Sequence, residues 1–190
     1  MKIYNDCYPC FLRQALKAAR FSTLDPEIHH SIIKNTLTIL QDLPRGATPP
    51  EICDQIHRSV RSIADETDPY KIFKKACTTS LIKQYDKMQK IRDTAPDPFE
   101  MAVSLAVSGN LIDAAAYDVL NIDEIINDAK QSEVKEQELS SFRADIHNAK
   151  NILYLADNAG ETVFDKLLLE LLLPTPITYV IKSGPVLNDA

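Results

Sequence analysis

The pattern of apolar and polar residues divides the chain into a long helical part and a short α/β part. Up to about Lys150 the apolar positions recur at spacings of three and four residues, the period of an amphipathic helix. This spacing predicts helices over residues 10–21, 25–43, 48–67, 68–91, 97–109, 122–129 and 136–149. No strand is predicted in this part of the chain.

Several of the predicted helices begin with the same local signal. Asp25, Thr48 and Asp68 are each followed directly by proline, which is the arrangement of an N-cap residue and the first residue of a helix. Gly109 follows the apolar run of its helix, where a left-handed residue past the carboxyl end is expected. These signals predict a compact helical domain.

The pattern changes abruptly after Lys150. Residues 151–157 and 177–182 are short apolar runs rich in strand formers, and residues 161–173 between them are helical by length and spacing. A strand, a helix and a strand over so few residues predict a βαβ unit with parallel strands. The loops that follow the two strands should therefore lie at the same edge of the sheet, where ligands usually bind in open α/β folds.

Composition and charge narrow the class of protein. The chain of 190 residues is 45% hydrophobic and 25% charged, as in an ordinary globular protein. Its formal charge of −6 argues against nucleic acid as a partner, because phosphate-backbone binding normally requires a basic surface. No apolar run is long enough to cross a membrane, and the amino-terminal residues lack the apolar core of a secretory signal. We expect a cytoplasmic protein whose four cysteines are reduced.

The scarce glycines indicate where shaped loops lie. Of the four glycines, three lie in the segments 109–113, 157–161 and 182–189, each of which contains an Asn and an Asp. Glycine is needed where the backbone takes a positive φ or approaches a ligand closely, so these segments are candidate sites. Plain turns and helix ends explain the same pattern about equally well.

The residue types in these loops favour a hard cation. Asp157 and Asp189 offer carboxylate oxygens and Asn158 an amide oxygen, whereas neither loop contains a histidine or a cysteine. Oxygen ligands suit Mg²⁺ or Mn²⁺ better than zinc, although Co²⁺ and Ni²⁺ compete for such sites. Lys182 ends the second strand and Gly160 precedes the helix, so an ammonium group and a helix amino terminus are also available for a phosphate.

Three ordered motifs carry a family resemblance. The segments GNLID at 109–113, DNAGE at 157–161 and KSGPVLND at 182–189 resemble those of the damage-control phosphatases, long catalogued as domain of unknown function 89. The early CYPC and the DPYK at 68–71 resemble the shorter archaeal and bacterial branch of that family. The resemblance covers nearly the whole chain.

The resemblance implies an α/β fold with a helical amino-terminal domain and a Rossmann-like α/β/α domain with a parallel sheet. We expect the helical domain at residues 1–95, and a helical connection with the start of the Rossmann-like domain at 96–190. Because such domains normally continue past the last motif, the sheet is expected to be incomplete. Self-association, a partner or further chain would then complete it.

The resemblance also implies an activity and residue roles. Relatives of this kind hydrolyse phosphomonoesters of small metabolites such as sugar phosphates, using Mn²⁺, Co²⁺, Ni²⁺ or Mg²⁺. The metal ligands implied by the motifs are Asp157, Asn158 and Asp189. The implied substrate contacts are Asn110, Gly160 and Lys182, and the implied catalytic residues are Asp113, Glu161 and Lys182.

The mechanism expected is transfer of the phosphoryl group to water with help from the metal ion, in which Lys182 neutralises developing charge. Either Asp113 or Glu161 is the base, and attack by an aspartate carboxylate is a further route. A carboxyl methyltransferase is disfavoured because DNAGE is not a glycine-rich cofactor loop. The remaining alternative is a non-catalytic helical interaction module, or a fragment that lacks the rest of its catalytic domain.

Other residues have less specific interpretations. Cys7, Cys10, Cys53 and His57 have a spacing that allows a second metal site, but buried free thiols are the more common outcome. The charged residues of the helix between the strands, namely Asp165, Lys166 and Glu170, are expected on its surface.

Overall fold

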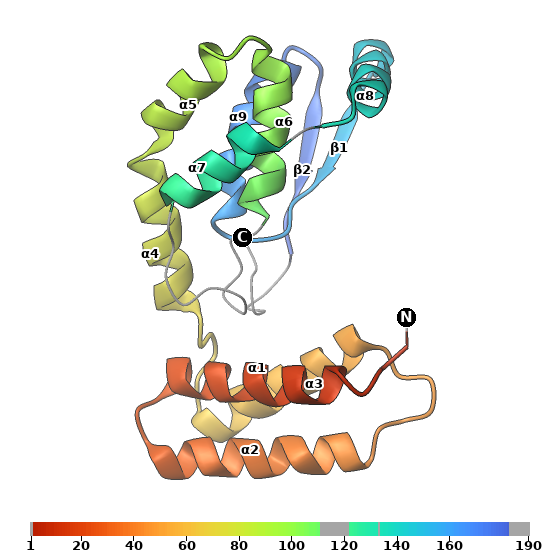
Figure 1. Ribbon diagram of the computed structural model, residues 1–190. Coiled ribbons are helices and arrows are strands. Elements are labelled where there is room, and N and C mark those ends of the chain that lie inside the picture. Colours follow the sequence, from red (N-terminus) through yellow and green to blue (C-terminus); the bar gives the residue numbers. More distant parts are fainter. Residues whose placement is uncertain (1, 111–121, 133, 183–190) are drawn as a thin grey trace. The chain divides into compact units, whose positions relative to one another are not determined.

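The computed structural model describes residues 2–110, 122–132 and 134–182 (Figure 1). Its elements are, in chain order, α1 Cys7–Ser22, α2 Pro26–Gln41, α3 Pro49–Ala64, α4 Lys71–Ile82, α5 Tyr85–Asp93, α6 Pro98–Gly109, α7 Ile122–Gln131, α8 Glu136–Asn148, β1 Ile152–Leu155, α9 Glu161–Leu172 and β2 Ile177–Val180. The α/β class predicted from the sequence is confirmed, because the described residues are mostly helical and include a small parallel sheet.

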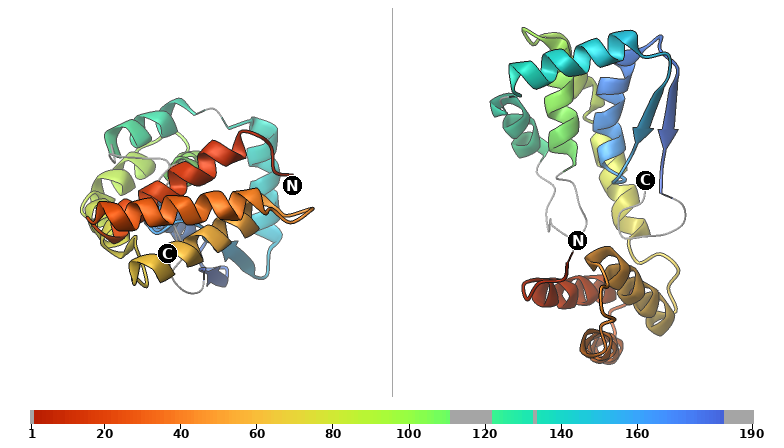
Figure 2. Two further views of the ribbon diagram at one scale, coloured as in Figure 1. Left: turned by 90° about the horizontal axis from the view of Figure 1, so that it is seen from below. Right: turned by 90° about the vertical axis from the view of Figure 1, so that its right-hand side faces the viewer.

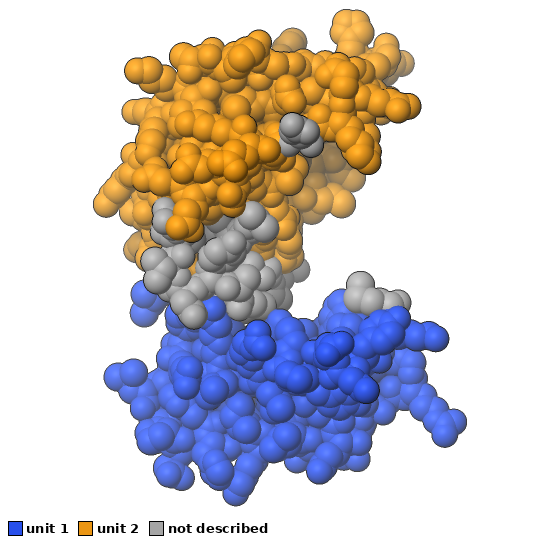
Figure 3. All heavy atoms as spheres, in the orientation of Figure 1, with its two compact units in different colours: residues 1–72, 185–187 blue, residues 73–184, 188–190 orange. Residues whose placement is uncertain are grey.

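The described residues form two compact units, one within residues 2–72 and one within residues 73–182 (Figure 3). The domain boundary predicted between residues 95 and 96 falls inside the second unit, between α5 and α6. None of the described helices combines the length and the apolar character needed to cross a membrane.

The first unit contains α1, α2 and α3, and each of these helices packs on the other two. Its core includes Phe11 from α1, Ile32 from α2 and Ile56 from α3, all almost fully buried. The carboxylate of Asp25 accepts the backbone N–H of Glu27 at 2.9 Å, so the predicted N-cap of α2 is confirmed. The helix starts predicted from Asp-Pro and Thr-Pro therefore hold for α2 and α3.

The predicted helix over residues 68–91 is wrong in two respects. The Asp68 carboxylate accepts the backbone N–H of Tyr70 at 3.1 Å, which holds a turn there, and α4 begins only at Lys71. The backbone N–H of Gln84 then bonds the Leu81 carbonyl at 2.9 Å, and this tight turn separates α4 from α5. The periodicity survives the break because Leu81 and Met88 enter the same core cluster.

In the second unit α9 packs on both the helices and the sheet. Phe164 and Leu167 contribute to a core shared with α4 to α7, while Leu168 and Leu172 belong to a cluster against which the strand residues Ile152 and Ile177 pack. A helix that is apolar on several faces is buried between layers. The position of α9 therefore fixes how the helices and the sheet of this unit meet.

The strands β1 and β2 are parallel (Figure 2). Ile152 lies opposite Ile177, and Tyr154 lies opposite Tyr179. The predicted βαβ unit is therefore confirmed. Alternate residues of β1 point away from α9, and Leu153 and Leu155 are 65% and 70% exposed. The carboxyl ends of both strands lie at one edge, as parallel pairing requires.

Candidate functional site at the carboxyl ends of the strands

The segment after β1 carries the first group of candidate residues. The pairing of the strands continues to Ala156, whose N–H bonds the carbonyl of Val180 at 2.9 Å. Asp157 and Asn158 come next, and Gly160 is the N-cap of α9 with a φ of −72°. Gly160 therefore occupies the helical region and is not present to provide a positive φ.

An ion pair joins the ends of the two strands. The ammonium group of Lys182, two residues beyond β2, contacts the carboxylate of Asp157, two residues beyond β1. The side chains are 34% and 45% exposed, so solvent and small ligands reach both partners. The residues that directly follow the two strands therefore meet at one edge, as the parallel topology predicted, whereas residues 183–189 of the second loop lie outside the described residues.

A buried carboxylate lies beside this pair. Glu161 is 7% exposed, and its Oε1 accepts the side-chain amide of Asn110 at 3.1 Å. Its Oε2 accepts the side-chain amide and the backbone N–H of Asn158, at 3.0 Å and 3.2 Å. Burial raises the pKa of Glu161 above its ordinary value, while the hydrogen bonds from Asn110 and Asn158 oppose that rise. Glu161 therefore links α6 to the loop after β1.

The position of Asn110 depends on close packing between α6 and α9. Gly109 is the last residue of α6, and Asn110 follows it with a φ of −64°. The left-handed conformation expected at Gly109 is wrong, because among the described glycines only Gly46 has a positive φ. A Cβ atom at Gly109 would lie 2.7 Å from the Cβ of Phe164. The glycine instead lets α6 approach α9, which brings Asn110 to Glu161.

The polar groups of the site border an open space. Asn110 and Glu161 form the polar end of a cavity of about 470 Å³ within the second unit. The remaining walls come from Val103, Ala106, Val107, Phe142, Tyr154 and Leu168. A cavity of this volume accommodates a small organic molecule.

Of the residues predicted for the site, the structure brings together Asn110, Asp157, Asn158, Gly160, Glu161 and Lys182. Asp113 and Asp189 lie outside the described residues, so their positions and their roles stay predictions. The described residues contain no group of three or more His, Cys, Asp and Glu side chains that could hold a metal ion. The predicted metal set does not depend on such a group, because it combines Asp157 and the amide of Asn158 with Asp189.

Sequence reasoning missed Asp165. It was expected on the surface of α9, but it is fully buried and accepts the hydroxyl groups of Tyr154 at 2.6 Å and Tyr179 at 2.7 Å. Burial raises its pKa, and the two tyrosine hydroxyls oppose that rise. The available signal was spacing, because Asp165 follows Glu161 by four residues and so lies on the same helix face. The other two charged residues differ, since Lys166 is exposed and Glu170 pairs with Lys166 and Arg92.

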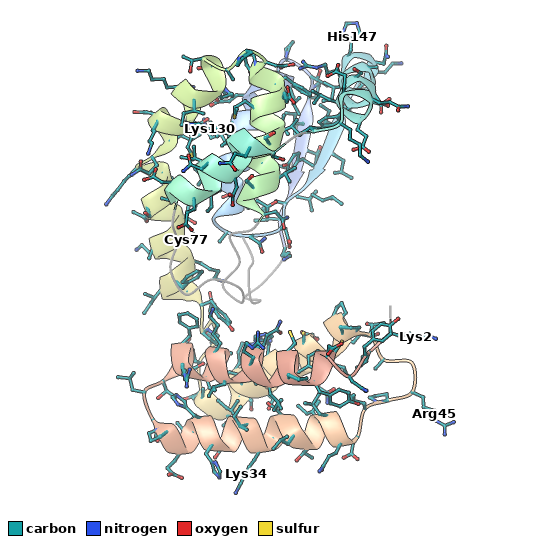
Figure 4. The ribbon with its side chains drawn as sticks, in the orientation of Figure 1. Lys2, Lys34, Arg45, Cys77, Lys130 and His147 are labelled. Atoms are coloured by element: carbon teal, nitrogen blue, oxygen red, sulfur yellow. The ribbon has the colours of Figure 1, made fainter. Side chains whose placement is uncertain are left out.

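Cys53 and His57 of the first unit were candidates for a second metal site, but the described residues contain no group of three or more side chains that could hold a metal ion there. The Cys53 thiol donates to the side-chain carbonyl of Gln14 at 3.2 Å, and burial raises its pKa to about 11. His57 is buried, and burial lowers its pKa to about 4. In the second unit, His147 lies at the opposite end from the carboxyl ends of the strands (Figure 4). The described part of the second unit contributes no histidine to the candidate site.

Taken together, the fold and the site define a class of protein. A Rossmann-like βαβ unit gathers a carboxylate, two side-chain amides and an ammonium group at the carboxyl edge of its sheet. In this class such an edge binds a small, usually anionic, ligand.

The chain belongs to the family of the damage-control phosphatase ARMT1-like domain, whose family model matches residues 3–190. It is 32% identical over 198 residues to an uncharacterized protein of Methanocaldococcus jannaschii, covering all of this chain and 65% of that protein. Proteins named damage-control phosphatase from Pyrococcus horikoshii and Archaeoglobus fulgidus are 25% and 27% identical, and this chain covers 67% and 68% of them.

A crystal structure of a DUF89 family protein from Pyrococcus horikoshii has the same fold. The TM-score is 0.82 at 23% identity, over all of this chain and 67% of that one. The resemblance to the damage-control phosphatases seen in the three sequence motifs is confirmed. The chain spans about two thirds of the length of these relatives.

Proposed function

We propose that the chain carries a metal-dependent phosphatase site for phosphomonoesters of small metabolites such as sugar phosphates. The observation that carries the proposal is the convergence of Asp157 and Lys182 at the edge where Asn158 and Asn110 meet Glu161. Membership of the family and the names of two relatives support hydrolysis of a phosphate ester.

The side-chain oxygen atoms at this edge are suitable ligands for a hard divalent cation. Asp157 is a partly exposed carboxylate, and the amide hydrogens of Asn158 point to Glu161 and Asp157. Asp157, Asn158 and Asp189 would hold Mn²⁺, Co²⁺, Ni²⁺ or Mg²⁺, all of which accept oxygen ligands. When bound, such an ion polarises a phosphate oxygen and stabilises the charge of the transition state.

Lys182 is suited to exchange one anionic partner for another. Its ammonium group neutralises Asp157 in the structure, and both side chains are open to solvent. Exposed ion pairs of this kind contribute only about 0–1 kcal/mol, so the pair is exchanged at little cost. Once Asp157 is engaged by a cation, the ammonium group of Lys182 can turn to a phosphate oxygen.

The contacts of Glu161 favour an orienting role over that of a base. A carboxylate offers about four lone-pair sites, and three hydrogen bonds from Asn110 and Asn158 occupy most of those of Glu161. A base needs an accessible lone pair near the attacking water. Of the two carboxylates predicted for proton abstraction, Asp113 therefore suits the base and Glu161 suits the positioning of the two asparagines.

The test is release of p-nitrophenol from p-nitrophenyl phosphate by the 190-residue chain with Mn²⁺, Co²⁺, Ni²⁺ or Mg²⁺. We expect release that EDTA abolishes and that Asp157→Ala reduces at least about 100-fold. The matched control is Asp145→Ala, which removes an exposed aspartate of α8 and should leave the rate unchanged. Release that persists in EDTA, or no release above the Asp157→Ala rate with any of the metals, would contradict the proposal. A panel of sugar phosphates then tests the substrate class.

A further inference from the structure

A fully buried carboxylate ties together the three elements that carry the site. Asp165 of α9 accepts hydroxyl groups from Tyr154 of β1 and Tyr179 of β2, at 2.6 Å and 2.7 Å. The tyrosines are opposite each other in the strand register, and their rings stack with centroids 5.5 Å apart and planes 18° from parallel. One side chain thus contacts both strands of the sheet and belongs to the helix between them.

Burying the Asp165 carboxylate costs free energy, which is justified only if its hydrogen bonds fix the geometry of the surrounding elements. Burial of a carboxylate is unfavourable, and no cationic side chain from the described residues pairs with Asp165. Two short bonds to a carboxylate offset part of this cost, since charge-assisted hydrogen bonds are roughly twice as strong as neutral ones. Apolar residues would pack the same space without the cost, but they would not fix the strands and the helix at one geometry.

The cluster formed by Asp165, Tyr154 and Tyr179 lies close in sequence to each group of the candidate site. Glu161 is one helical turn before Asp165 on α9. Tyr154 precedes Asp157 by three residues on β1, and Tyr179 precedes Lys182 by three residues on β2. A small rotation of α9 against the strands would therefore move Glu161 relative to both loops.

We propose that Asp165 is a positioning residue: by binding Tyr154 and Tyr179 it holds α9 against β1 and β2 so that Glu161 meets Asn158 and Asn110. The proposal deepens the proposed function and rests on it for the catalytic readout. Its geometric content is independent of catalysis, because the contacts of Glu161 are observable without any substrate.

The experiment compares Asp165→Asn, Tyr154→Phe and Tyr179→Phe with wild type. The matched control is Tyr85→Phe, which removes a hydroxyl group that accepts a solvent-exposed hydrogen bond from Lys166 of α9. The first readout is the pair of ¹⁵N side-chain amide signals of Asn110 and Asn158, assigned from Asn110→Ala and Asn158→Ala. The second is kcat and KM for p-nitrophenyl phosphate with the metal that gives the highest rate.

We expect both amide signals to shift in the three cluster variants and to stay in place in Tyr85→Phe. We expect kcat to fall about 10- to 100-fold, since a misplacement of about 1 Å costs up to about 100-fold, while KM changes less than about threefold. A residue that serves only stability would lower the unfolding midpoint without moving the amide signals or kcat of the folded protein.

Unchanged amide signals in folded Tyr154→Phe and Tyr179→Phe would overturn the proposal, whatever the activity. If Asp165→Asn does not fold, these two variants still decide, because each removes one hydroxyl and leaves the ring. If wild type shows no metal-dependent release, the proposed function fails, while the amide signals still test the positioning role.

Discussion

Gly109→Ala tests the close approach of α6 to α9, on which the position of Asn110 depends. The added Cβ would lie 2.7 Å, 2.8 Å and 3.0 Å from the Cβ, Cγ and Cδ2 of Phe164. Phe164 is fully buried, and its Cβ is fixed to the backbone of α9, so neither partner can yield without a shift of a helix.

The expected magnitude combines two opposing effects. Alanine favours a helix over glycine by about 1 kcal/mol, because glycine loses more conformational freedom. Overpacking costs about 1–3 kcal/mol, and contacts this short to a fixed atom place Gly109→Ala near the upper value. We expect a net loss of about 2 kcal/mol in the free energy of unfolding. The displaced Asn110 should also lower the rate of phosphate release.

The assay is urea unfolding followed by circular dichroism, in a double-mutant cycle with Phe164→Ala. Gly109→Ala should cost at least about 1 kcal/mol less when residue 164 is Ala, because the contacts with Cγ and Cδ2 are then gone and only the contact with Cβ remains. The matched control is Gly46→Ala, where φ is 85° and no atom lies within 4 Å of the added Cβ. Its cost comes from the backbone and should be the same with either residue at 164. The reasoning is refuted if Gly109→Ala is neutral, or if its cost is independent of residue 164.

Three further changes test other parts of the structure by urea unfolding. The pKa of His57 is lowered from 6.5 to about 4 in the folded chain. The stability that neutral His57 gives the folded chain is therefore complete above pH 6.5 and is lost as the pH falls through 4. Wild type should lose about 3 kcal/mol more than His57→Leu between pH 7 and pH 4, and equal losses would contradict this. Arg92→Met should lower the free energy of unfolding by about 3 kcal/mol, because buried Arg92 donates to the Leu167 carbonyl at 2.7 Å and to Glu170 at 3.0 Å. A loss below about 1 kcal/mol would contradict the importance of these contacts. Asp97→Ala should cost about 1 kcal/mol, because it removes the hydrogen bonds to two backbone N–H groups at the start of α6; a cost no greater than that of Asp145→Ala would argue against this cap.

The features that the sequence predicted well are those set by neighbouring residues. The cap of α2 at Asp25 depends only on the next two residues. The strands on either side of α9 are recognisable because they are short apolar runs without the three- and four-residue spacing of a helix. The parallel pairing and the shared edge then follow from the connection alone. For that reason the proximity of Asp157 and Lys182 is predictable from the sequence.

The features that the sequence did not predict depend on what packs against a residue. Asp165 has the composition of a helix surface position, and only the two tyrosines on separate strands make its burial tolerable. Gly109 has the pattern of a helix end, but its role comes from Phe164, which lies far along the chain. The turn at Gln84 interrupts a continuous helical period, which periodicity alone does not register.

Asp157, Glu161 and Asp165 show how the same chemical group is given three roles at spacings of four residues. From the edge of the sheet inward, the Asp157 side chain is 45% exposed, while Glu161 and Asp165 are 7% and 0% exposed. Their partners change in parallel from an ammonium group to amides to hydroxyls.

Only the outermost carboxylate has a partner that solvent can replace, so only Asp157 can exchange that partner for another cation. The two inner carboxylates are held by neutral donors, so the negative charge that each carries when ionised is not neutralised by an ion pair among the described residues. We infer that this charge favours a divalent over a monovalent cation at Asp157. Asp165→Asn should therefore weaken binding of Mn²⁺ by isothermal titration calorimetry more than Asp145→Asn does, and equal affinities would contradict this electrostatic argument.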